Sequence, residues 1–251
     1  KNPILKSLIL DSPNFLEECK GVVPKNKIWA HISGTDLIKD HTGKFYVLED
    51  NLRVPSGVAY MLENRNVMKK VVTELFNNYK VSPIDDYTSQ LYKCLSDASY
   101  SKDKKKTIVI LSPGVFNSAY FEHAYLAQQM GIVLVESSDL YLSDDNYVFM
   151  KTISGKKKID VIYRRINDDY LDPNVWIKDS TLGLPGLINS WKEKKVAIVN
   201  APGSGVADDK AVYAFVPKMI EFYLNEKPKL AQVKTYLCAF DKDKKYVLDN
   251  I

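Results

Sequence analysis

The strongest constraint on the fold is a pair of short, predominantly apolar segments that flank an amphipathic one. Residues 107–111 and 132–135 are continuous apolar runs, and residues 119–130 between them have helical spacing and end at Gly131. Buried parallel strands have such continuous runs, and a helix connects two of them in a βαβ unit. Glycine ends helices because it adopts positive φ without strain. The sequence therefore predicts a βαβ unit over residues 107–135.

Further segments extend this α/β pattern in both directions. Strands are predicted over residues 148–150 and 158–163, around a turn at Gly155, and over 196–200. Helices are predicted over residues 58–80, 87–99 and about 208–224. The whole region from 107 to 224 is predicted to be a Rossmann-like α/β unit.

Composition and cysteine usage narrow the functional classes. The 251 residues are 45% apolar and 26% charged, which is typical of a globular chain. The net charge of +4 comes largely from short lysine runs without a basic stripe, so no nucleic-acid partner is predicted. The three cysteines are far apart in the sequence, and no apolar run approaches the ~18 residues that cross a membrane. A cytoplasmic protein without a membrane partner is predicted, and the oligomeric state stays open.

A β-hairpin is predicted over residues 28–51. Alternating apolar and polar residues on both sides of a turn at residues 40–44 are typical of two paired strands. Asp36 lies near the end of one strand and Glu49 near the end of the other, and Asn51 follows two residues later. Residues two apart on a strand project from the same face, so the hairpin presents carboxylate and amide oxygens together. Magnesium prefers such ligands, and these three residues are the predicted metal ligands.

The spacing of Asp36, Glu49 and Asn51 resembles the metal-binding hairpin of ATP-grasp ligases. A closer resemblance, to the circularly permuted ATP-grasp family often labelled glutathionylspermidine synthase-like, covers nearly the whole chain. It is carried by Gly-Thr-Asp at 34–36, Val-Leu-Glu-Asp-Asn-Leu-Arg-Val-Pro-Ser-Gly at 47–57, Leu-Glu-Asn-Arg at 62–65, Phe-Glu-His-Ala-Tyr-Leu-Ala-Gln-Gln-Met-Gly at 121–131, Tyr-Arg-Arg-Ile-Asn-Asp-Asp-Tyr-Leu-Asp-Pro at 163–173 and Asn-Ala-Pro-Gly-Ser-Gly-Val-Ala-Asp-Asp-Lys at 200–210.

The resemblance implies a fold order and a set of cofactors. It implies that residues 1–69 are part of the metal-binding lobe, that 70–232 form a Rossmann-like pre-ATP-grasp domain and that 233–251 begin the lid lobe. The cofactors are then ATP and magnesium. The chain looks like a central fragment, with the rest of the lid lobe expected after residue 251, so these residues alone are expected not to turn over substrate.

The resemblance also suggests residues that contact the reacting groups. The loop after the hairpin is expected to contact the acceptor or the acyl group, through Arg53, Ser56 and Gly57 as catalytic candidates. Another branch of ATP-grasp ligases has Arg two positions before the metal Asp, where this chain has Gly34, so Arg53 is the candidate oxyanion-stabilising cation.

Substrate-binding candidates come from the ends of the predicted α/β strands, where ligands of such sheets bind. They are Glu122, His123, Arg164, Arg165, Ser204 and Gly205. Either arginine could hold a substrate carboxylate in a fork, or could instead pair with the nearby aspartates at 168, 169 and 172. For His123 a structural role is the alternative, and for Ser204 and Gly205 the alternative is simple helix capping.

Together these features predict an ADP-forming carboxylate–amine ligase that acts through an acyl phosphate on small-molecule or peptide-like acids and amines. The alternative is a degenerate ATP-grasp scaffold that binds nucleotide without ligation. An NAD-linked Rossmann domain is less consistent with the sequence, because Asp208 stands where the dinucleotide fingerprint needs its third glycine.

Overall fold

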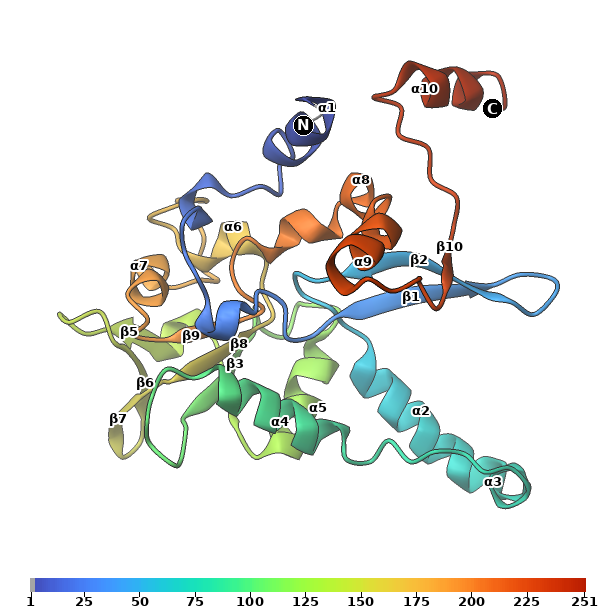
Figure 1. Ribbon diagram of the computed structural model, residues 1–251. Coiled ribbons are helices and arrows are strands. Elements are labelled where there is room, and N and C mark those ends of the chain that lie inside the picture. The colour runs from blue at the N-terminus through green and yellow to red at the C-terminus, as the bar shows by residue number, and fades with distance from the viewer. Residues whose placement is uncertain (1–2) are drawn as a thin grey trace. The chain divides into compact units, whose positions relative to one another are not determined.

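A computed structural model of the protein describes residues 3–251, with side chains from residue 6 onward. The structure is mixed α/β and has both parallel and antiparallel sheets (Figure 1). Contacts divide it into two compact units. Unit 1 joins the segment that ends at Gly21 to Ile32–Pro55 and Pro202–Ile251, and unit 2 comprises Val22–His31 and Ser56–Ala201. The predicted lobes over 1–69, 70–232 and 233–251 have other boundaries, and they stay predictions.

Unit 1 is built on a long antiparallel hairpin. Strand β1 (Gly34–Lys39) pairs with β2 (Phe45–Asn51), and β10 (Ala231–Gln232) adds to β2 in parallel (Figure 1). The turn forms as predicted, because Oδ1 of Asp40 accepts hydrogen bonds from the amides of Thr42 and Lys44.

The first strand of the hairpin begins later than predicted. It starts at Gly34 rather than at residue 28. Trp29 and His31, which precede it, belong to unit 2 and have partners there. The carbonyl of Trp29 accepts from the Ala201 amide at 2.9 Å, and the His31 amide donates to the Asn200 side chain at 2.8 Å. The alternating pattern upstream of Gly34 therefore belongs to an irregular segment, with bends at Trp29 and His31, that has partners of its own.

The remaining elements of unit 1 are short helices. They are α1 (Pro3–Leu10), η1 (Glu17–Cys19), η4 (Ser204–Asp208), α8 (Lys210–Tyr213), α9 (Val216–Leu224) and α10 (Asp241–Leu248). The single helix predicted over 208–224 is wrong, because η4 ends at Asp208 and two separate helices, α8 and α9, follow it. Asp209 caps α8 by accepting from the Ala211 amide at 2.9 Å, and α9 restarts with a proline in its first turn.

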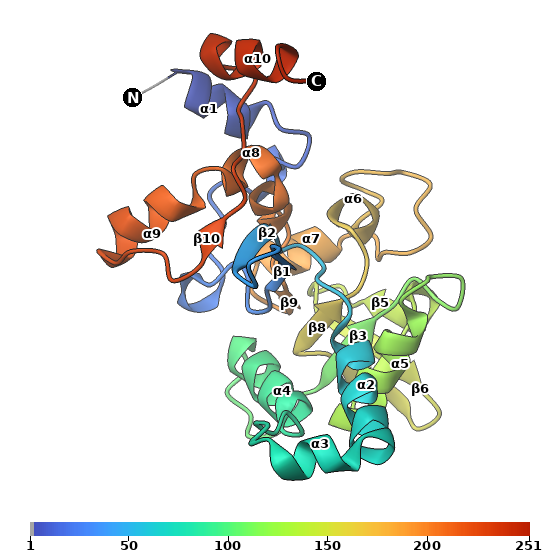
Figure 2. The same cartoon turned by 90° about the vertical axis from the view of Figure 1, so that its right-hand side faces the viewer.

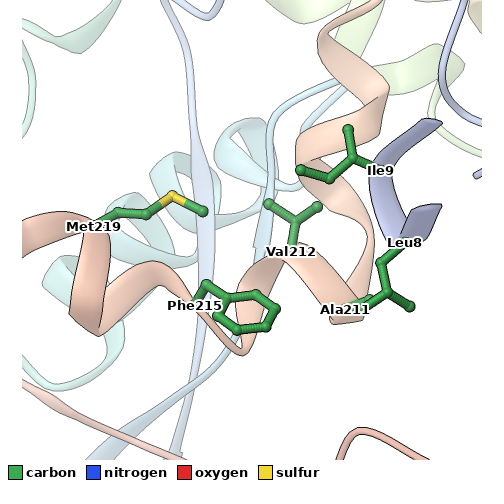
Figure 3. A pocket seen from close by; sticks show the side chains of 6 residues that line it. All are labelled: Leu8, Ile9, Ala211, Val212, Phe215 and Met219. Carbon is green, nitrogen blue, oxygen red and sulfur yellow. The ribbon is translucent and has the colours of Figure 1, made fainter. Parts of the chain in front are cut away.

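An apolar pocket of about 240 Å³ lies between α1 and the α8–α9 segment. Figure 3 shows its six side chains, which carry no charge: Leu8, Ile9, Ala211, Val212, Phe215 and Met219.

Unit 2 contains a four-stranded parallel sheet in the order β4-β3-β8-β9. Its strands are β3 (Ile108–Leu111), β4 (Val133–Val135), β8 (Val161–Arg164) and β9 (Ala197–Val199). All residues of β3 and β8 are buried, as expected for central parallel strands. The predicted βαβ unit is confirmed, since α5 (Tyr120–Met130) connects β3 and β4 and ends at Gly131 in the left-handed region. Figure 2 shows α5 close to β3.

An antiparallel sheet accompanies the parallel one in unit 2. It comprises β5 (Leu140–Leu142), β6 (Val148–Thr152) and β7 (Gly155–Lys158). The single strand predicted over 158–163 is wrong, because the chain changes partners within it. The Ile159 amide donates to Val148, whereas the Asp160 amide donates to Thr107, which directly precedes β3. The segment therefore divides into β7 and β8, which belong to different sheets.

Helices of unit 2 include α2 (Val58–Val71) and α3 (Thr73–Asn78), where one helix over 58–80 was predicted. They separate at Val72, whose φ of −121° and ψ of 47° are not helical. The other elements are η2 (Lys25–Lys27), α4 (Tyr87–Ala98), η3 (Ser137–Asp139), α6 (Asp168–Leu171) and α7 (Leu187–Lys192), and α4 matches its prediction. Within residues 3–251, no helix has both the length and the apolar character that crossing a membrane requires.

Candidate functional site

The hairpin of unit 1 brings the predicted metal ligands onto one face. Asp36 on β1 lies directly opposite Glu49 on β2, and Asn51 lies opposite Gly34, two residues further along. Directly paired residues of an antiparallel ladder point to the same face, as do residues two apart on one strand. Asp50 alternates to the other face, where its carboxylate accepts the Thr35 hydroxyl at 2.7 Å.

Gly34 leaves the space beside Asn51 open. A Cβ built on Gly34 would lie 3.0 Å from Cβ of Pro55 and 3.8 Å from Cβ of Asn51. The first distance is closer than side chains normally approach, so any larger residue would push against Pro55. Glycine therefore lets the loop after β2 pack against the base of the hairpin, beside the Asn51 amide.

The donor chemistry of this face fits magnesium. Two carboxylates and an amide are hard oxygen ligands, and Mg²⁺ is usually held by one or two carboxylates together with substrate phosphates. The described part of the chain contains no cluster of three or more His, Cys, Asp and Glu placed to hold a metal. The fit thus rests on Asp36 and Glu49 with Asn51 as the neutral ligand.

Lys210 is a further member of this face that the sequence did not predict. Its ammonium group forms an ion pair with Oε2 of Glu49, although the two residues are 161 positions apart. This hydrogen bond and the lysine charge hold the pKa of the Glu49 carboxyl below its usual range. A cation is therefore already present at the carboxylate face.

Asp208 fixes the loop that follows β2. Its Oδ1 accepts from the backbone amides of Leu52 and Arg53, the latter at 3.1 Å, and its Oδ2 lies 3.6 Å from Nε of Arg53. The predicted catalytic Arg53 is thus held by a carboxylate within unit 1, with a further contact of 3.4 Å to the Asn14 amide oxygen. The adjacent Asp208 and Asp209 after Gly203-Ser204-Gly205 were the signal for this cluster, but the sequence did not predict their contacts with the hairpin loop.

In unit 2, a buried ion pair joins two predicted substrate-binding residues. Nη2 of Arg165 lies 2.7 Å from Oε1 of Glu122, and both side chains are 0% exposed. The other oxygen of Glu122 accepts from the amides of Gly57 at 2.7 Å and Ala59 at 3.0 Å, at the start of α2. The same Arg165 nitrogen donates to the Ser56 hydroxyl at 2.9 Å.

This network gathers four of the predicted site residues, Ser56, Gly57, Glu122 and Arg165. Because the carboxylate satisfies amides at the N-terminus of α2, it stabilises the helix as well as the arginine. Gly57 has a φ of +112°, which favours glycine over any other residue. A structural role for the pair is therefore established in unit 2, and substrate binding by Glu122 and Arg165 stays a prediction.

Arg164 has different partners from its neighbour. Nη2 lies 3.1 Å from Oδ1 of Asp168, and Nε donates to the carbonyl of Asn200 at 2.8 Å. The pairing with a nearby aspartate, one of two alternatives in the sequence, is the one observed. A second aspartate, Asp172, instead accepts from the amides of Gly186 and Ile188, each at 2.9 Å, around the start of α7.

His123 is buried beside Ser112. Its Nδ1 lies 2.9 Å from the serine hydroxyl, and burial followed by the Arg165 charge lowers its pKa to about 4. The imidazole is therefore neutral near pH 7. Ser204 and Gly205 are buried in η4, directly after Gly203 at a φ of +87°. Substrate binding by these three residues stays a prediction.

Comparisons with known proteins agree over the length of the chain. The sequence profile described as "Circularly permuted ATP-grasp type 2" matches residues 1–251. An uncharacterized protein of Synechocystis sp. is 49% identical over 97% of this chain and 50% of its own length. An uncharacterized protein of Mycobacterium tuberculosis is 48% identical over 99% of this chain and 45% of its own. The chain thus spans about half the length of these curated relatives.

A more distant relative carries a functional name. A protein of Frankia casuarinae named "Putative glutamate--cysteine ligase 2-2" is 37% identical over 97% of this chain, which covers 28% of that protein.

Proposed function

This chain belongs to the circularly permuted ATP-grasp type 2 family, and from that premise we propose that the full protein is an ATP-dependent ligase joining a carboxylate to an amine. The observation that carries the proposal is the hairpin face of Asp36, Glu49 and Asn51, whose donors suit the magnesium that accompanies ATP. The name of the Frankia relative supports amino-acid-like substrates as the class to test first.

The proposed reaction has two steps. The substrate carboxylate attacks the γ-phosphorus of ATP, giving an acyl phosphate and ADP. The amine then attacks the acyl carbon, and phosphate leaves as the amide forms. Magnesium bound at Asp36, Glu49 and Asn51 would neutralise charge on the phosphates. The protein mainly positions the reactants and stabilises developing charge.

The loop after the hairpin is proposed to contact the acyl group. Arg53 supplies a guanidinium for an oxyanion, and Asp208 keeps that side chain in one orientation. Ser56 offers a hydroxyl next to Arg165. The amide of Gly57 already donates to Glu122, so the role proposed for Gly57 is the positive φ that turns the chain into α2.

Finer assignments belong to the same proposal. The parallel sheet of unit 2 is proposed as the Rossmann-like pre-ATP-grasp domain, with Glu122, His123, Arg164 and Arg165 on its substrate side. Ser204 and Gly205 of unit 1 are also proposed to bind substrate. We also propose a cytoplasmic location and small-molecule or peptide-like substrates. The glutathionylspermidine synthase-like label is a guide to the type of reaction and does not name the substrate. The lid lobe expected after residue 251 and the inactivity of these residues alone stay predictions.

The first test is the thermal stability of the full protein with magnesium and ATP. A ligand at 100 times its dissociation constant adds about 2.7 kcal/mol of apparent stability, which is readily measured as a rise in Tm. Glu49→Gln should abolish the magnesium-dependent part of the rise, because it removes one charged ligand. Asp50→Asn is the matched control, since it makes the same change one residue away on the opposite face, and it should keep the rise.

Two outcomes decide between the ligase and the alternative nucleotide-binding scaffold. ADP release that requires both an acid and an amine identifies the ligase, and Glu49→Gln should reduce it at least a hundredfold, as loss of a charge-stabilising group does elsewhere. Magnesium-dependent ATP binding without ADP release for any amino-acid-like pair would favour the scaffold. A parent protein whose Tm does not respond to magnesium and ATP would contradict both.

A further inference from the structure

The cation on the carboxylate face of the hairpin comes from a loop remote in sequence. Lys210 is the first residue of α8, and its ammonium contacts the same Glu49 carboxylate that is proposed to bind magnesium. The lysine side chain is 64% exposed and the glutamate side chain 30% exposed. An ion pair with this much solvent around it can open and close without burying an uncompensated charge.

The two residues before Lys210 anchor its position. Asp208 binds the backbone amides of Leu52 and Arg53, immediately after the strand that carries Glu49. Asp209 accepts the Ser12 hydroxyl at 2.9 Å and caps α8 through the Ala211 amide. The backbone of Lys210 is therefore fixed beside the hairpin, while its side chain can move.

Charge balance explains why a lysine belongs there. Asp36 and Glu49 are directly opposed on the hairpin, and like charges in such pairs destabilise an antiparallel ladder. A single ammonium group offsets part of this repulsion. A divalent cation offsets it more fully, but the ammonium and the metal repel each other and compete for the Glu49 oxygens.

We propose that Lys210 is a positioning cation that exchanges with the metal. It neutralises the Asp36–Glu49 pair when no divalent ion is bound, and it turns to the nucleotide phosphate when the ion takes its place. The phosphate is the anion that Lys210 would turn to, because Mg²⁺ held by Asp36 and Glu49 would bring nucleotide phosphates to the same face. This inference rests on the proposed function of the same face.

The test measures metal and nucleotide separately, in the full protein. Mn²⁺ serves as the paramagnetic probe. Its dissociation constant is measured in the absence of nucleotide, from the electron paramagnetic resonance signal of the free ion. Lys210→Met should bind Mn²⁺ about two- to fivefold more tightly, because an exposed ion pair competes only weakly. Titration with ATP at saturating Mg²⁺ should show severalfold weaker nucleotide binding in the same variant. Lys242→Met, which removes an exposed lysine of α10, should change neither constant.

The outcomes separate this inference from the proposed function. If Mn²⁺ binding is unaffected by Glu49→Gln, the metal assignment itself fails. If Glu49→Gln weakens Mn²⁺ binding but Lys210→Met leaves it unchanged or weaker, the exchange is overturned while the ligase proposal stands. Tighter Mn²⁺ binding with unchanged ATP affinity overturns the phosphate contact. Only opposite shifts of the two constants support the whole inference, and a purely structural lysine would not produce them.

Discussion

His123 is a titratable side chain in a place that disfavours its charged form. It is 1% exposed, it contacts the Ser112 hydroxyl, and the Arg165 guanidinium adds a like charge nearby. Burial likewise lowers the pKa of His31, which lies in the same unit. The folded protein therefore holds these imidazoles neutral under conditions where an unfolded chain would protonate them.

This difference makes stability depend on pH. The pKa of His123 falls from 6.5 to about 4 on folding, so its contribution is complete above pH 6.5 and is lost as the pH falls toward 4. Each unit of pKa difference corresponds to about 1.4 kcal/mol, and we expect a loss on the order of 2 kcal/mol from this group. Urea unfolding between pH 7 and 4.5 measures it. His123→Gln should flatten the slope, whereas His41→Gln, in the exposed hairpin turn, should leave it unchanged; equal slopes in all three would contradict the argument.

At the scale of single residues, the placement of the proposed metal ligands on one face could be predicted, and the residues that contact them could not. Asp36, Glu49 and Asn51 are close in sequence, and the period of a strand is enough to place them on one face. Lys210 and Asp208 reach the hairpin from more than 150 positions away. No local periodicity encodes such a contact, which depends on how unit 1 assembles from separate segments.

At the scale of elements, the Glu122–Arg165 pair joins α2, α5 and the end of β8. The carboxylate lies on α5, the guanidinium directly follows β8, and the amides of Gly57 and Ala59 open α2. The hydroxyl of Tyr163, which is buried on β8, also accepts a hydrogen bond from Arg165 at 2.9 Å. One ionic cluster thus adds to the apolar contacts that hold helices to a sheet, such as those of the buried Leu126 on α5.

Removing one partner of this pair should be costly. Glu122→Gln keeps the shape but leaves the buried guanidinium without its counter-charge, and we expect a loss of about 3–5 kcal/mol in the free energy of unfolding. The surface pair of Lys69 and Asp85, with side chains 40% and 60% exposed, is the comparison. Lys69→Met should cost less than about 1 kcal/mol. Chemical denaturation of both variants is the measurement. A loss of unfolding free energy in Glu122→Gln as small as that in Lys69→Met would show that the buried cluster is not structural.

Elements were predictable where a local signal marks both ends. The unit from β3 through α5 to β4 was predictable, because apolar runs mark its two strands and Gly131 marks the end of its helix. The segment 158–163 was not, because the change of partner at Asp160 depends on Thr107, about fifty positions earlier. The helix over 208–224 failed because Asp209 and Pro217 restart it, a capping signal that apolar spacing alone hides.

At the scale of the whole molecule, neither unit is one continuous stretch of chain. The chain passes between the units after Gly21, His31, Pro55 and Ala201. The short segment Val22–His31 belongs to unit 2, where the rings of Trp29 and Trp191 meet edge to face with centroids 6.3 Å apart. Segments that are adjacent in the sequence therefore often belong to different units, so the order of the chain does not predict which segments fold together.

The contribution of that segment can be measured. Trp29→Ala should lower the free energy of unfolding by about 2 kcal/mol, because it removes the edge contact to a side chain that is only 2% exposed. Trp29→Phe keeps an aromatic ring and should lose less than half as much. Guanidinium unfolding followed by far-UV circular dichroism gives both values. No loss in Trp29→Ala would mean that Val22–His31 adds nothing to the stability of unit 2.

The resemblance of long motifs predicted the family correctly, and the matched profile confirms it over residues 1–251. Substrate identity was not predictable in this way, because the residues proposed to contact the acid and the amine, such as Glu122 and Arg165, are buried in an internal pair. Their types satisfy a structural need as well as a chemical one, so the sequence does not distinguish the two.

The hairpin also contains an irregularity with a consequence for how such proteins diverge. Pairing passes from Asp36–Glu49 to Leu37–Val47, so Leu48 is an extra residue between two registers. The half that carries Asp36, Glu49 and Asn51 is thereby set apart from the half that ends in the exposed turn. The outer strand segments are held in turn by β10, which pairs with Tyr46 and Val47, and by the Tyr213 hydroxyl, which donates to the Val47 carbonyl at 2.6 Å. Changes in chain length are therefore tolerated best in the turn itself, where they need not rotate a carboxylate to the other face.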